Sequence, residues 1–329
     1  MEDHINPFVQ GPDISPPPVV EPPGVQDPIA IRERQRLAAL EKTAALEKIA
    51  AKYRELGGFS GFGLLGNPVG EFVEVGHGAY RQDYNLGRIT TKRNDIPLET
   101  LTVASIDVAA IHCFGTDDPT PAADEPYLIL VAISPGGLFS GSITQTWRSE
   151  VFENIRSDTT FATELPAFRG LPVSSAGLYL KAILMEQQEG DPESVRQKIE
   201  EKAKAVADDV KRAGELLLSG SDLDAAVGNA ALNSKILDML GDLSLNILTG
   251  FLQDDVIDSK SIHLPADWLA SLIDNHDASK VHYPPTELPE HIFSNYPYGN
   301  QFDPFWLFTN GDASYKVYFN VVVNQWQPR

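Results

Sequence analysis

Apolar residues occupy both faces of two neighbouring segments, residues 106–114 and 127–133, which a short acidic segment connects. In the second segment Tyr127, Ile129 and Val131 alternate with Leu128 and Leu130, so neither face is polar. A strand that is apolar on both faces is normally covered on both. We therefore expect two paired strands in the middle of a sheet, and a third strand of the same kind over residues 176–186.

The last strand has a different pattern. In residues 313–326 the odd positions from Tyr315 to Val323 are apolar or aromatic, whereas Lys316 and Asn320 lie on the opposite face. This period of two predicts a half-buried antiparallel strand.

Helical periodicity marks three further segments. Residues 28–56 begin after Asp27 with a proline at the first helical position and end at a Gly-Gly pair, as helices often do. Residues 193–218 repeat apolar side chains every three or four positions, and residues 265–276 predict a short helix. The apolar stripe of helix 28–56 predicts packing either on its own domain or on a second copy of the chain.

Strands before and after a helical block, without regular βαβ alternation, predict an α+β fold. We expect an antiparallel β-sandwich with a helical insertion, preceded by a long N-terminal helix and a small glycine- and aromatic-rich module. The predicted divisions are a disordered proline-rich tail (1–27), the helix with its module (28–93), and the sandwich (94–329) with an insertion at about 193–275.

The net charge, the single cysteine and the first residues of the chain limit the partners and the location that we expect. The 329 residues carry a formal net charge of −20, which disfavours nucleic acid and anionic membrane surfaces. The single cysteine, Cys113, excludes an intramolecular disulfide and has the apolar neighbours of a buried structural thiol. The first residues lack the basic and apolar regions of a secretory signal. We expect a cytoplasmic protein, or one exported by a non-classical route.

The module has a recognisable order of landmarks: IAAKYRELGG, GLLGNPVGE and GAYRQDYNLGRI follow one another over residues 49–89. This order resembles one LGFP repeat, although Asn67 stands where that family has an aromatic residue and only one copy is present. LGFP repeats are associated with bacterial cell-wall and polysaccharide proteins. The resemblance implies a glycan- or surface-binding module, and the contact residues that it implies are His77, Tyr80, Arg81, Asp83 and Tyr84. A purely structural role for the single copy is the alternative.

Two acidic segments are candidate metal sites in the sandwich, whose layout is similar to calcium-binding C2-like sandwiches and to an uncharacterised bacterial domain family. Ca²⁺ takes six to eight oxygen ligands, which clustered carboxylates from two loops could supply. Neither segment has the spacing of an EF-hand, and solvated acidic loops are the alternative. The predicted ligands are Asp117, Asp118, Asp124 and Glu125 in the first loop, and Asp254, Asp255 and Asp258 in a second acidic turn.

The known catalytic motifs are missing from the sequence: it has no G-x-S-x-G elbow, no P-loop and no H-E-x-x-H pair. We therefore predict a non-enzymatic binding protein that recognises a glycan or protein surface, with Ca²⁺ at its loops. One alternative is a toxin-like or pore-forming effector whose amphipathic helices, residues 193–252, engage membranes. A second is a carboxylate-based hydrolase, which requires a deep pocket with two converging acids.

Overall fold

The computed structural model describes residues 28–58, 63–76, 78–92, 95–116, 124–135, 144–188, 190–219, 234, 236–238, 240–241, 255–273, 305–311 and 313–327. The predicted tail, residues 1–27, lies outside these ranges. The chain divides into two compact units, Met1–Lys42 and Thr43–Arg329. Within the first, residues 28–42 form the beginning of a long helix whose side chains are almost all exposed.

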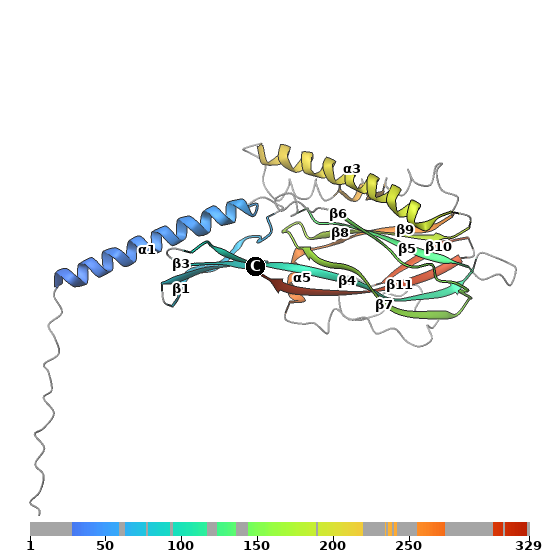
Figure 1. Ribbon diagram of the computed structural model, residues 1–329, viewed down its shortest axis with the longest axis horizontal. Helices are drawn as coiled ribbons and strands as arrows, with labels where there is room; N and C mark the ends of the chain where they lie inside the picture. Colours follow the sequence, from blue (N-terminus) through green and yellow to red (C-terminus); the bar gives the residue numbers. More distant parts are fainter. Residues whose placement is uncertain are drawn as a thin grey trace, which may run out of the picture. The chain divides into compact units, whose positions relative to one another are not determined.

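The described elements confirm the α+β class with antiparallel sheets (Figure 1). In chain order they are α1 (Pro28–Glu55), β1 (Pro68–Gly76), β2 (Ala79–Tyr84), β3 (Gly87–Lys92), β4 (Leu98–Gly115), β5 (Pro126–Ile133), β6 (Thr144–Arg148), β7 (Thr159–Pro172), β8 (Leu178–Glu186), α3 (Pro192–Ser219), β9 (Asp255–Leu264), α5 (Ala266–Ser271), β10 (Phe305–Asn310) and β11 (Ala313–Trp326).

The end of α1 shows why the chain turns into the module at this point. Gly57 and Gly58 have φ of 97° and 50°, which is left-handed backbone that favours glycine, and the Gly58 amide donates to the Tyr53 carbonyl at 2.8 Å. This confirms the helix end that the sequence predicts. Ile49, Tyr53 and Leu56 then pack with the module, so the last part of α1 is buried against its own domain.

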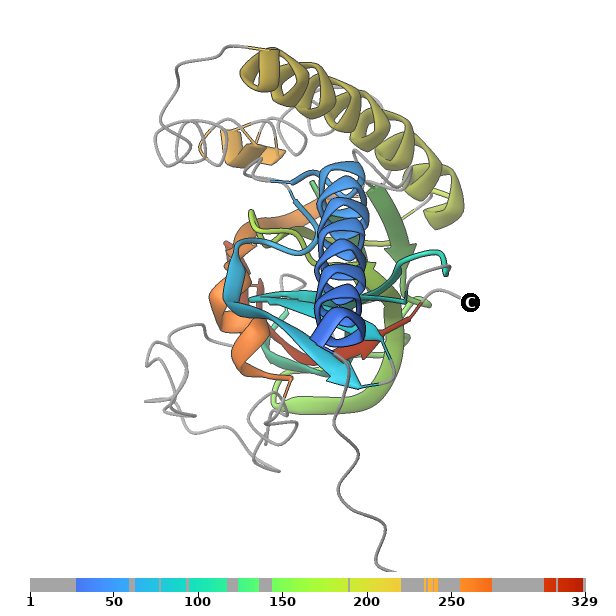
Figure 2. The same ribbon diagram turned by 90° about the vertical axis from the view of Figure 1, so that its left-hand side faces the viewer.

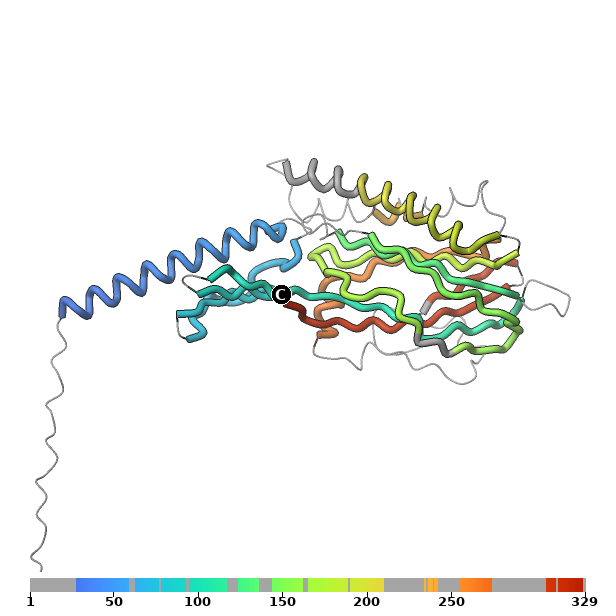
Figure 3. Tube along the Cα trace, viewed as in Figure 1, coloured from blue at the N-terminus to red at the C-terminus, as the bar shows by residue number. Residues whose placement is uncertain are grey.

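The larger sheet has the order β1-β2-β3-β4-β11-β10, and β7 also pairs with β4. β4 is 18 residues long: its first residues pair with β3, and residues from Val103 onward pair with β7. The module and the sandwich therefore share one continuous sheet, and Figure 3 shows β4 running from one into the other.

A bulge in β4 keeps its inward face apolar along this length. Opposite β11 the register shifts between Val108 and Ala110, where two residues of β4 are passed for one of β11, so Ala109 is the extra residue. Before the bulge the inward residues are Ala104, Ile106 and Val108; beyond it they are Ile111 and Cys113.

The smaller sheet, ordered β6-β5-β8-β9, forms the second layer of the sandwich. One of its faces packs on the larger sheet through Leu128, Leu130, Leu180 and Leu184. The other face, with Tyr127, Ile129 and Ile183, is covered by Val195 and Ile199 of α3 and by two further helical residues, Ile236 and Leu240. α3 is therefore a third layer over the smaller sheet, as Figure 2 also shows.

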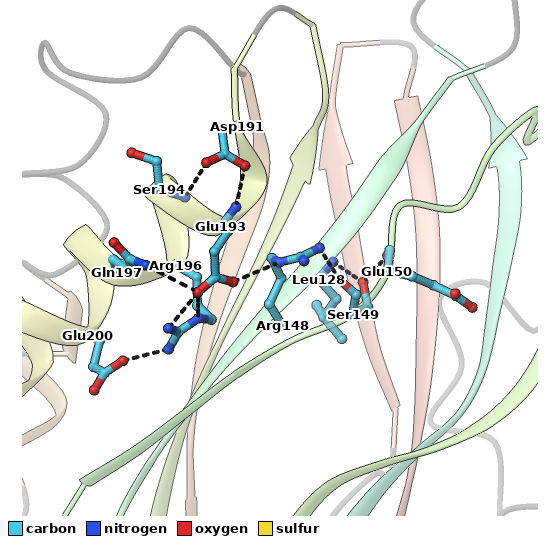
Figure 4. Close-up of polar contacts among 10 residues, drawn as sticks. All are labelled: Leu128, Arg148, Ser149, Glu150, Asp191, Glu193, Ser194, Arg196, Gln197 and Glu200. Atoms are coloured by element: carbon cyan, nitrogen blue, oxygen red, sulfur yellow. Dashed lines mark hydrogen bonds and ion pairs between the residues drawn. The ribbon is translucent and has the colours of Figure 1, made fainter.

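Polar contacts fix the N-terminal end of α3 (Figure 4). The Asp191 carboxylate accepts the backbone amides of Glu193 at 3.2 Å and Ser194 at 3.3 Å, as an N-cap residue does. Glu193 lies 3.6 Å from Arg148 of β6 and 2.7 Å from Arg196. This network joins the helix to the smaller sheet.

Three expectations differ from the structure. β4 and β5 are apolar on both faces, but they lie in different sheets and face each other across the core instead of pairing. Residues 255–264, predicted to begin with an acidic turn, form strand β9, because Ile257 and Leu264 are needed in the core beside β8. The last strand, β11, is expected to be buried on one face alone. Lys316 and Tyr318, which lie on its outer face, are also buried.

Candidate functional site

The module sheet, made of β1, β2, β3 and the first residues of β4, separates the predicted contact residues onto two faces. Successive side chains of a strand point to opposite faces, so Tyr80 and Tyr84 lie on one face while Arg81 and Asp83 lie on the other. His77, the remaining predicted contact, lies outside the described residues.

Tyr80 and Tyr84 belong to the face that packs against α1. The Tyr84 ring stacks on Tyr53 at 4.7 Å between centroids, and the Tyr80 ring stacks on Phe72 at 5.3 Å. The Tyr53 hydroxyl donates to the Gly66 carbonyl at 2.8 Å, and burial raises the pKa of both Tyr53 and Tyr84. These rings hold the module together, and both Tyr80 and Tyr84 are buried.

The opposite side of this sheet is largely accessible, and we call it the open face. Residues paired across its strands form two rows, because opposed residues of antiparallel strands share a face. The rows are Val73–Arg81–Thr90–Leu98 and Val69–Asp83–Arg88–Thr100.

Charge and apolar surface are unevenly distributed on the open face. Arg81 and Asp83 form an ion pair at 3.0 Å, and Arg88 donates to Gln325 at 2.8 Å, so these polar groups are engaged within the protein. The apolar side chains at its two ends remain exposed: Val69 by 52%, Val73 by 37% and Leu98 by 59%. Of the four described contact residues that the resemblance implies, Arg81 and Asp83 therefore lie on accessible surface, whereas Tyr80 and Tyr84 are buried.

A cleft of about 420 Å³ lies between the end of α1 and the segment before β4; its described lining residues are Lys48, Ala51, Lys52, Glu55, Asp95, Ile96 and Pro97. Lys52 lies 2.9 Å from Glu55 and 3.4 Å from Glu99. Partial burial lowers the pKa of Lys52, but the two glutamates outweigh it and the net pKa is raised. The charges of this cleft are largely neutralised internally.

A second cleft, of about 300 Å³, lies where β4, β7 and β11 meet near the module. Its described lining is apolar: Leu64, Leu101, Val103, Gly170, Pro172 and Trp326. Trp326 is 51% exposed and forms part of its rim. Sequence reasoning missed this cleft because its lining comes from four segments that are distant in the chain.

Asp124 of the first acidic loop is not free to act as an open metal ligand. Its carboxylate accepts a hydrogen bond from the Tyr315 hydroxyl, and its side chain is buried at the end of the sandwich core. Cys113 lies in the same cluster, and burial raises the pKa of its thiol to about 11. Glu125 is exposed, whereas Asp117 and Asp118 lie outside the described residues.

The second acidic segment is part of β9. Asp255 pairs in register with Glu186, and Glu186 pairs with Pro126, so Asp255 and Glu125 lie at the same end of the smaller sheet, two strands apart. Asp258 lies further along β9, where its carboxylate contacts Lys260 at 2.7 Å and accepts the Thr309 amide at 3.1 Å. Asp254 lies outside the described residues.

Within the ranges that the structure describes, no group of three or more His, Cys, Asp or Glu side chains is placed to hold a metal ion. The calcium site stays a prediction that depends on the loop residues beyond those ranges.

In comparisons with known proteins, no family model, no curated protein and no solved structure matches this chain. The LGFP resemblance therefore stays a prediction. Among the described helices, none combines the length and the apolar character that crossing a membrane requires.

Proposed function

We propose that this protein is a non-enzymatic recognition protein, and that the open face of its module binds a partner polypeptide. The observation that carries this proposal is the exposed apolar surface of β1 and β4. Val69, Val73, Val75 and Leu98 are each more than a third exposed, on a sheet whose other face packs against the end of α1 through Tyr84 and Ile89. Apolar residues gathered on an accessible surface are typical of protein interaction sites.

A polypeptide suits this surface better than a glycan does. Sugar hydroxyls need hydrogen-bonding partners when they leave water, and an unmatched buried polar group is costly. On the open face Arg81 is paired with Asp83 and Arg88 with Gln325, and the Trp326 cleft is lined by apolar residues. Glycan binding is the competing outcome of the test.

The test uses the full chain against a glycan array and a displayed library of linear peptides. The variant Val69→Thr/Val73→Thr/Val75→Thr removes apolar surface but keeps side-chain shape and strand propensity. A matched control, Leu37→Ser/Leu40→Ser, removes exposed apolar surface from α1. We expect enriched peptides that lose binding with the valine variant alone. Selective glycan binding, or peptides insensitive to the valine variant, would contradict the proposal.

The control also examines self-association. Leu37 and Leu40 are exposed on α1, as a helix-to-helix contact between two copies would require. If the predicted self-association through residues 28–56 occurs, sedimentation should show a dimer of the unmodified chain that the α1 variant lacks.

A second candidate, membrane engagement by the helical layer, is favoured by the construction of α3. Its apolar side chains, Val195, Ile199 and Ala203, cover an apolar face of the smaller sheet and would become exposed on detachment. The hydrogen bond from Arg196 lowers the pKa of Glu193, so the contact with Arg148 persists at neutral pH and is lost as pH falls through that lowered value.

This candidate predicts leakage of dye-loaded anionic vesicles only at acidic pH. The variant Glu193→Gln should shift leakage toward neutral pH, because it removes the charge that contacts Arg148. Intact vesicles at every pH and lipid composition would eliminate the candidate.

The calcium and hydrolase hypotheses have simpler tests. The calcium hypothesis predicts that a chelator lowers the melting temperature and that added Ca²⁺ restores it. The hydrolase hypothesis requires a pocket with two converging acids. The Trp326 cleft has no acidic residue among its described lining, whereas the α1 cleft is lined by Glu55 and Asp95, and Glu55 there is paired with Lys52.

A further inference from the structure

β1 ends the larger sheet, and its outer edge is accessible. It is the terminal strand in the order of that sheet, and no other described strand pairs with the edge that faces away from β2. Eight of its nine residues are exposed, and only Phe72 is half-buried. Unpaired amide and carbonyl groups along such an edge are a template for an additional strand.

The charge of β1 determines which kind of strand this edge can accept. Glu71 and Glu74 are both exposed on β1, and the whole chain carries −20. A second copy pairing through its own β1 would place these glutamates close to those of its partner, and like charges opposite each other disfavour pairing. A basic segment would instead be attracted.

We propose that the free edge of β1 accepts an extended basic segment of a partner protein, which adds a strand antiparallel or parallel to β1. This inference rests on the proposed recognition function and specifies its geometry. Main-chain hydrogen bonds to the edge would supply binding, and alternating side chains would supply specificity. The pattern is set by β1 itself: an apolar residue beside Val73 on the open face, and Lys or Arg beside Glu74 and Phe72 on the other.

The test uses a defined probe, the acetylated and amidated nonapeptide (Lys-Val)₄-Lys. Its control is the same peptide with N-methyl groups on two consecutive central residues, which blocks both of its edges without changing its charge. We expect saturable binding of the first peptide to the full chain, at least tenfold weaker binding of the second, and slower hydrogen exchange in residues 68–76 on binding.

Protein variants separate charge from main-chain pairing. Glu71→Lys/Glu74→Lys should weaken binding of the basic probe at least tenfold at low salt, because it reverses the attraction. Val73→Pro and Glu74→Pro are matched variants, since consecutive amides point to opposite edges of a strand. We expect the proline whose amide faces β2 to lower the melting temperature, and the other to abolish probe binding while the fold remains intact.

Equal binding of the two peptides, no binding of either, protection outside residues 68–76, or a β1-mediated dimer of the free chain would each overturn the strand-addition proposal. A failure of strand addition can be distinguished from a failure of the proposed recognition function. Library peptides that need Val69, Val73 and Val75 but leave the β1 amides unprotected would support recognition by the open face without strand addition.

Discussion

Replacement of Lys181 by methionine should stabilise the protein at neutral pH. Lys181 lies in β8 on the face that carries the helical layer, and only 2% of it is exposed. Its ammonium group donates to Ser261 of β9 at 3.2 Å. Burial lowers its pKa from 10.5 to about 8, although the nearby Asp258 carboxylate offsets part of this effect.

The magnitude follows from this shift in pKa. Each pKa unit corresponds to about 1.4 kcal/mol, so keeping Lys181 charged in the fold costs about 3 kcal/mol relative to the unfolded chain. Below pH 8 Lys181 is charged in both states, and the full free-energy cost opposes folding. Between pH 8 and 10.5 the folded protein releases the proton and this cost diminishes. Above pH 10.5 Lys181 is neutral in both states and the cost is zero. Methionine has a similar length, fits an apolar site and carries no charge.

The assay is urea unfolding of both proteins at several pH values between 6.5 and 10.5. Lys181→Met should be more stable by about 3 kcal/mol at pH 7, and the difference should shrink toward zero near pH 10.5. Lys204→Met, which removes an exposed lysine of α3 that pairs with Glu200, serves as the control and should show no such trend. A Lys181→Met protein that is less stable at all pH values, or whose advantage does not depend on pH, would refute the reasoning.

Three further predictions concern the core and its turns. The Cys113 thiol is buried and its pKa is raised to about 11, so a thiol reagent should label it only after unfolding. Tyr315→Phe removes the hydroxyl that donates to buried Asp124 and should cost about 1–3 kcal/mol in chemical unfolding. Gly177→Ala should destabilise by more than about 1 kcal/mol, because φ is +78° and a Cβ would collide with a backbone carbonyl, whereas Gly241→Ala, a helical position with open space, should be neutral or stabilising in the same assay.

The module shows how much of the candidate site the sequence could predict. Resemblance to an LGFP repeat directed attention to residues 77–84, and the structure places Arg81 and Asp83 together on the open face. Tyr80 and Tyr84 belong to the packed face, because alternate residues of one strand must point to opposite sides. The exposed valines of β1 carried no sequence signal, since valine is equally common in buried strands.

The acidic segments show a second limit. Local composition predicted two carboxylate loops, but it could not reveal that Asp124 is bonded to Tyr315, a residue 191 positions later. Nor could it reveal that residues 255–264 are required as a fourth strand beside β8. Which residues contact each other across such distances in the sequence depends on which strands become neighbours. Long-range packing decides this.

By itself, the sequence determined the α+β class, the extents of α1 and α3, the glycine helix end at Gly57 and Gly58, and the inward face of β11. These depend on local periodicity and backbone preference, which are encoded in consecutive residues. Only the tertiary structure decided that β4 and β5 lie in separate sheets, since two-sided apolarity specifies burial on both faces but not the neighbouring strand. It also placed β1 at the end of its sheet, where no other described strand pairs with its outer edge, because the position of a strand in a sheet depends on which other strands pair with it.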